Sequence, residues 1–176
     1  MSTNPAHLLL KAYYERLHER MAAGRDRLIS RVDELLAAEI AKRDFKDMDS
    51  SKLAAYREAS VAFIDERLET YNPIGIQYTF GPSSSRTAAE LEFELNWYNS
   101  RPEFADLVAA ARSLAGSETP DEILPALADD LIAQVGAFPD RSIIETYTAE
   151  PALQRLPDYV VARAIEEIVC GRKPTA

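Results

Sequence analysis

Two short stretches near the middle of the chain, Ile74 to Phe80 and Leu91 to Trp97, alternate strictly between apolar and polar residues. Alternation of this kind places the apolar side chains on one face of an extended strand. The regions on either side have helical periodicity instead. Because a two-stranded ribbon is only marginally stable by itself in water, its apolar face must be covered by helices or by another chain. The pattern therefore predicts a β-hairpin set into a mainly helical protein.

The second stretch also has a helical interpretation. Thr87 followed by Glu90 forms a capping-box pattern, and a helix that begins there would place four residues on one face: Ala88, Leu91, Leu95 and Tyr98. Such a helix would leave Phe93 and Trp97 opposite the apolar stripe. We therefore favour a strand over residues 91–97 and keep a helix as the alternative.

Helical periodicity extends over residues 5–71. Between Leu10 and Leu35, apolar residues recur every three or four positions, with one gap of seven that spans Gly24. Glycine inside a helix costs about 1 kcal/mol relative to alanine, so we expect one bent helix or two nearly collinear helices in the first part of this region. Asp47, Asp49 and Ser50 are candidate caps for the next helix. The pattern predicts a long N-terminal antiparallel helical hairpin over residues 5–71.

The chain beyond Ser100 is predicted to form a C-terminal cluster of shorter helices. Pro102 and Pro157 stand near the first turns of two of them, where proline is favoured. Pro125 falls inside the pattern of a third helix and predicts a break or a late start. The 176 residues suffice for one domain with its own core. We predict a mainly α protein with a small β-hairpin (class α+β), a single domain over 1–176: a helical hairpin over 5–71, a β-hairpin insert over 72–99 with its strands near 74–97, and a helical part over 100–171.

Acidic residues outnumber basic ones, and the formal net charge of the chain is −9. The excess lies in the second half, because residues 87–170 contain 16 acidic and 5 basic side chains. Affinity for a phosphate backbone comes from cations, so direct binding to nucleic acid is disfavoured. A basic protein partner fits this charge better.

The only cysteine is Cys170, so this chain alone cannot build an intrachain disulfide, a thiolate zinc site or an iron–sulfur cluster. The first uninterrupted apolar run, Leu8 to Leu10, is too short for the central region of a signal peptide. No later run approaches the roughly 20 apolar residues of a membrane span. We expect a cytoplasmic protein without a cofactor and without membrane contact.

Glu15 and His18 form a Glu-x-x-His pair, whose side chains share one face of a helix. Di-iron carboxylate bundles need two such pairs and two further carboxylates. The other histidine, His7, has no acidic residue three positions before it. The pair is therefore a weak metal candidate, and a solvated helix face is the favoured interpretation.

Paired carboxylates are the other basis on which catalysis could rest. Glu92 and Glu94 would stand on the same side of a strand, about 7 Å apart, which is compatible with the acid and base roles of a glycosidase. An exposed acidic strand face that discourages aggregation is the simpler interpretation. No catalytic residue is assigned, and a carboxylate-dependent enzyme, with or without a metal, is the second alternative function.

Recognition is favoured over catalysis. A local acidic cluster could bind a basic surface on another protein, and its members are Glu90, Glu92, Glu94, Glu103 and Asp106. Trp97 and Tyr98 are adjacent, so a strand would expose one of them as an interface anchor. We predict a non-catalytic protein-interaction or assembly protein, dimeric through the helical hairpin or the strand edge. The first alternative is an acidic decoy that inhibits a basic nucleic-acid-binding protein.

Overall fold

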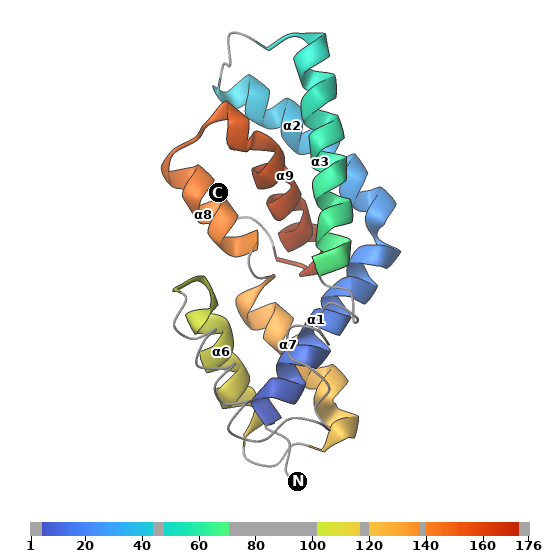
Figure 1. The fold of residues 1–176 in the computed structure, drawn as a ribbon, viewed down its shortest axis with the longest axis vertical. Helices are drawn as coiled ribbons and strands as arrows, with labels where there is room; N and C mark the ends of the chain where they lie inside the picture. The colour runs from blue at the N-terminus through green and yellow to red at the C-terminus, as the bar shows by residue number, and fades with distance from the viewer. Residues whose placement is uncertain (1–4, 44–47, 71–101, 117–119, 138–139, 173–176) are drawn as a thin grey trace.

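The computed structural model describes residues 5–43, 48–70, 102–116, 120–137 and 140–172. Their regular structure consists of helices (Figure 1). No helix within these ranges is both long and apolar enough to cross a bilayer. The α-helices are α1 (Pro5–Ala23), α2 (Arg25–Arg43), α3 (Ser50–Thr70), α6 (Pro102–Ala115), α7 (Leu124–Val135), α8 (Asp140–Ala149) and α9 (Leu156–Ala164).

The predicted α+β class is wrong. Helical residues make up 89% of the part that the structure describes, and this part contains no strand. The predicted strands near 74–97, the whole 72–99 insert and the helical alternative for residues 91–97 lie outside the described residues. Alternation over seven residues is a short signal, whereas helical periodicity extends over whole elements on either side of it. The described fold is therefore all α.

A break at Gly24 separates α1 from α2, as predicted. We expected one bent helix or two nearly collinear helices, and the chain changes direction at this point (Figure 1), so the bend is the arrangement observed. Gly24 N–H still donates to the Arg20 carbonyl at 3.0 Å, and Leu28 N–H donates to the Gly24 carbonyl at 2.9 Å. A Cβ at Gly24 would lie 3.2 Å from the Arg20 carbonyl oxygen and 3.6 Å from Ile168 Cγ2. The tight contact is with the Arg20 carbonyl of the preceding turn, whereas the distance to Ile168 is an ordinary van der Waals contact.

The helices of the predicted N-terminal hairpin do not pack only on each other, because α9 packs against two of them. α9 contacts α2, α3 and α8, and it lies between α3 and α8 in Figure 1. Most residues of α9 are apolar and buried, as is typical of a helix in a protein interior, and Asp158 and Arg163 are its partly exposed residues. It continues into a π-helical segment, η4 (Ile165–Val169), and Gly171 follows with a positive φ of 65°.

The other half of the molecule is built from α1, α6 and α7. α1 packs against both of the other helices, which also contact each other, and Figure 1 shows the three together near the N-terminus. α7 begins at Leu124 with Pro125 in its first turn, after the short 3₁₀ helix η2 (Asp121–Ile123). The proline therefore marks a late start, one of the two predicted outcomes. Fully buried side chains of α1, among them Tyr13 and Leu17, belong to one core that continues to α9.

Candidate functional site

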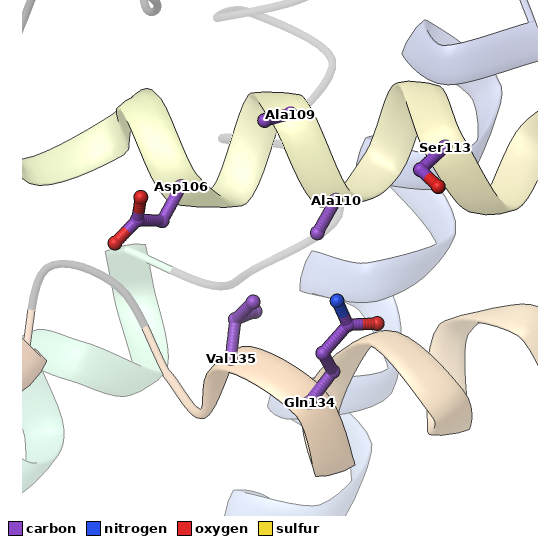
Figure 2. Close-up of a pocket in the computed structure, with 6 residues that line it drawn as sticks. All are labelled: Asp106, Ala109, Ala110, Ser113, Gln134 and Val135. Atoms are coloured by element: carbon purple, nitrogen blue, oxygen red, sulfur yellow. The ribbon is translucent and has the colours of Figure 1, made fainter.

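A groove lies between α6 and α7 and opens to the surface. Its volume is about 390 Å³. Figure 2 shows Gln134 and Val135 pointing from α7 toward Ala110 on α6. We call this feature the α6–α7 groove, and the residues that line it are Asp106, Ala109, Ala110, Ser113, Gln134 and Val135.

The α6–α7 groove has an apolar floor and a mainly polar rim. Ala110 and Val135 form the floor and are only 6% and 4% exposed. Asp106, Ser113 and Gln134 are exposed at the rim. A buried apolar centre with an accessible polar edge is the usual anatomy of a protein–protein contact.

Short side chains on α6 create the groove. The face of α6 that packs on the core carries Leu107 and Ala111, which are buried. The neighbouring positions toward α7 are occupied by Ala109, Ala110 and Ser113. Because these side chains are small, they leave open the space that a leucine at the same positions would fill.

The electrostatics of the groove are set by carboxylates. Among the described residues that line it, Asp106 is the only charged one. Residues 102–137 contain seven acidic residues against Arg112 alone, a formal net charge of −6. The groove therefore lies in a negatively charged part of the chain.

One carboxylate of α7, Asp129, is held by α1. It accepts hydrogen bonds from Arg16 Nε at 2.8 Å and from Arg20 Nη2 at 2.6 Å. Burial raises the pKa of Asp129, but the hydrogen bonds from the two arginines outweigh burial and hold this pKa below its ordinary value. Asp129 therefore ties α7 to α1, and the negative field at the groove comes from the other carboxylates.

The end of α7 that carries the groove wall is fixed by residues distant in sequence. The Tyr13 hydroxyl donates to the Gly136 carbonyl at 2.6 Å. Ala137 N–H donates to Glu166 Oε1 at 3.1 Å. Gly136 has a φ of 76°, and a Cβ there would lie 2.3 Å from Glu166 Oε1. Glycine is required because both this backbone conformation and the buried carboxylate exclude a side chain.

A second polar cluster joins α2, α8 and α9. The Tyr147 hydroxyl donates to Glu39 Oε2 at 3.2 Å, and the Tyr147 ring stacks on Tyr159 with 4.0 Å between centroids. Burial, followed by the charge of Glu39, raises the pKa of Tyr147 to about 12. The Arg163 guanidinium carbon lies 5.6 Å from the centroid of the Tyr159 ring. Because these polar groups bond to one another and both rings are buried, the cluster stabilises helix packing.

A second hollow, of about 380 Å³, lies beside α2 and η4. Its lining carries charges of both signs, and the residues are Asp26, Arg27, Ser30, Arg31, Glu34 and Ile168. Arg31 already forms ion pairs with Glu34 and Glu167. A surface whose charges are mutually compensated in this way favours no charged ligand, so the α6–α7 groove is the better candidate.

Of the predicted interaction residues, Asp106 is the one that lines the α6–α7 groove. Glu103 lies in the first turn of α6. The other five lie outside the described residues: Glu90, Glu92, Glu94, Trp97 and Tyr98. The acidic cluster as a whole therefore stays a prediction.

The weak metal candidates lie on α1. Glu15 forms an ion pair with Lys11 at 3.9 Å, and both Glu15 and His18 are partly exposed. The described residues contain no group of three or more histidine, cysteine, aspartate or glutamate side chains that could hold a metal ion.

Reasoning from the sequence missed most of the groove lining, namely Ala109, Ala110, Ser113, Gln134 and Val135. Two signals were present: three consecutive alanines at 109–111, and Gln134 within the otherwise apolar end of α7. Neither signal shows by itself that α6 lies beside α7. That contact arises only in the folded chain.

Comparisons with known proteins do not suggest a function for this chain. No protein-family model matches the chain, and searches of curated proteins and of solved structures gave no significant match.

Proposed function

We propose that this chain is a non-catalytic protein-interaction protein that binds a basic segment of another protein in the α6–α7 groove. The observation that carries the proposal is the groove itself, which has a buried apolar floor and the carboxylate of Asp106 at its rim. The formal net charge of −6 over residues 102–137 supports a basic partner, because complementary charge speeds association and orients the partner.

The size of the groove indicates how such a partner would bind. A volume of about 390 Å³ is near the lower end for ligand pockets and suits one or two side chains. An amphipathic helix of the partner could place a small apolar residue over Ala110 and Val135. A lysine or arginine beside it would then form a charge-assisted hydrogen bond with Asp106.

The acidic decoy is a narrower form of the same proposal, in which the partner is a nucleic-acid-binding protein. Its support is the charge of residues 87–170, which contain 16 acidic and 5 basic side chains. Such a surface would compete with nucleic acid for a basic groove. Dimer formation and a cytoplasmic location are further parts of the proposal. The apolar patterning of the helical segments supports dimer formation. The single cysteine, Cys170, which is buried, supports a cytoplasmic location.

A charge reversal in the groove tests the proposal. The probe is a fluorescently labelled helical peptide of lysine, leucine and alanine, about 20 residues long so that it can form a helix. Its binding is measured by fluorescence anisotropy at several salt concentrations. We expect Asp106→Lys to weaken binding about tenfold, or about 1.4 kcal/mol, because the charge at the groove rim changes from negative to positive.

The matched control is Glu58→Lys, which makes the same change of charge on an exposed position of α3. We expect this control to bind the peptide nearly as well as the wild-type protein, and we expect salt to weaken wild-type binding because exposed charges are screened. Equal losses in the two variants, or binding that does not respond to salt, would contradict the proposal.

A further inference from the structure

The last turn of α7 forms one wall of the α6–α7 groove, and Arg172, near the C-terminal end of the described chain, helps Tyr13 and Glu166 to hold that end of the helix. We infer that Arg172 is a latch: when it is bound, Gln134 and Val135 stay in place, and when it is released, the groove wall loosens. The link to binding rests on the proposed function of the groove, whereas the latch itself does not.

Arg172 caps the C-terminal end of α7. Its Nη1 donates to the carbonyl oxygens of Ala133 at 3.2 Å and Gln134 at 3.0 Å. The last carbonyl groups of an α-helix have no partner within the helix, and a basic side chain can satisfy them while compensating the negative end of the helix dipole. Arg172 thus replaces partners that α7 cannot supply itself.

The same guanidinium is bound from the opposite side by Glu166. Arg172 Nε lies 2.9 Å from Glu166 Oε2, and Glu166 Oε1 accepts the hydrogen bond from Ala137 N–H. Glu166 therefore connects Arg172 to the residue that follows Gly136. Glu166 of η4 and Arg172, which follows η4, therefore hold the turn after α7 and the carbonyl end of α7.

The two members of this pair differ in their exposure. The Glu166 side chain is 11% exposed and the Arg172 side chain is 31% exposed. Gly171 precedes Arg172 with a φ of 65°, and a Cβ at Gly171 would meet no atom within 4 Å. The buried carboxylate is thus the fixed part of the latch. The backbone of Arg172 is held as well, because its N–H donates to the Glu166 carbonyl at 2.9 Å, so the part that can leave is the more exposed guanidinium.

Latch and groove are coupled because they share the last turn of α7. Binding free energies of coupled sites are reciprocal. A ligand that prefers the ordered groove wall must therefore also favour the bound state of Arg172. Loss of Arg172 must lower the affinity of the groove for that ligand.

The experiment measures amide hydrogen exchange and peptide binding on the full chain. The variants are Arg172→Gln, Arg172→Lys and the control Arg155→Gln, which changes an exposed arginine of the 3₁₀ helix η3 (Leu153–Arg155). Without any ligand, we expect Arg172→Gln to speed exchange of the Gly136 and Ala137 amides about tenfold, relative to amides of α9 in the same molecule. Arg172→Lys should have an intermediate effect, since an ammonium group lacks the planar fork of a guanidinium.

The lysine-rich peptide probe then tests the coupling. We expect its affinity for Arg172→Gln to fall about threefold to tenfold, with no change for Arg155→Gln. Unchanged exchange at Gly136 and Ala137 in Arg172→Gln would overturn the latch. Faster exchange with unchanged peptide affinity would overturn the coupling and leave the proposed function standing. If the wild-type chain does not bind the peptide, the proposed function fails, and the exchange rates alone decide on the latch.

Discussion

Among the glycines that the structure describes, Gly136 leaves the least room for a side chain. Its φ of 76° and ψ of −153° are accessible almost only to glycine, and the carboxylate of Glu166 occupies the place of its missing Cβ. Gly136→Ala should therefore lower the free energy of unfolding by about 3 kcal/mol, from backbone strain and from displacement of a buried carboxylate. Urea denaturation followed by circular dichroism measures this loss.

Gly116→Ala is the matched control for that substitution. Gly116 also has a positive φ, of 66°, but a Cβ there would meet no atom within 4 Å. It should cost only the backbone strain, about 1 kcal/mol. If the two variants lose the same stability, the contact between Gly136 and Glu166 does not carry the effect.

At the scale of the elements, local signals predicted where helices begin and break. Asp49, one of the predicted caps, accepts a hydrogen bond from Lys52 N–H at 2.8 Å at the start of α3. Gly24 and Pro125 mark the predicted break and late start. These features depend on residues within one turn of each other, which is why sequence alone could predict them.

The arrangement of the elements could not be predicted in the same way. The hydrogen bond from Tyr13 to Gly136 joins residues 123 positions apart, and nothing in the local pattern of either helix indicates the other. The insertion of α9 beside α2 and α3 has the same origin in long-range packing. The β-hairpin was predicted from two alternating runs of seven residues each, and both lie outside the described residues, which are helical.

The junction between η4 and α2 makes a prediction about pH. Glu167 accepts hydrogen bonds from Arg31 and lies 3.6 Å from Arg163 Nη2. The hydrogen bond from Arg31 outweighs burial and holds the pKa of Glu167 below its ordinary value of 4.5. As the pH falls, the Glu167 carboxylate is protonated in the unfolded chain before it is protonated in the folded chain. The stability that Glu167 contributes is therefore present above about pH 4.5 and is lost as the pH falls through the lower pKa of the folded state.

Glu167→Gln should accordingly lower the free energy of unfolding by about 2 kcal/mol at neutral pH. The difference from the wild-type protein should shrink below about pH 4, which urea denaturation over a pH series measures. Glu34→Gln removes the other carboxylate bound to Arg31. The Glu34 side chain is 66% exposed. This control should cost less than about 0.5 kcal/mol. Equal losses in the two variants would show that burial of Glu167 does not matter.

At the scale of the whole molecule, the sequence shows how charge is distributed along the chain. It does not show that part of this charge lies beside the α6–α7 groove. The acidic excess of residues 87–170 pointed to a basic partner, and Asp106 was one of the residues chosen. The apolar floor of Ala110 and Val135 became evident only once α6 and α7 lay side by side. Charge can be counted along a chain, whereas a groove depends on which helices the core brings together.

The most direct test of the central claim is a map of amide hydrogen exchange in the full chain, with and without the lysine-rich helical peptide. The claim that the α6–α7 groove is the binding site predicts slower exchange in α6 and in the last turns of α7, and unchanged exchange in α2 and α3. Slower exchange confined to α2 and α3, or no change anywhere at a saturating peptide concentration, would contradict it.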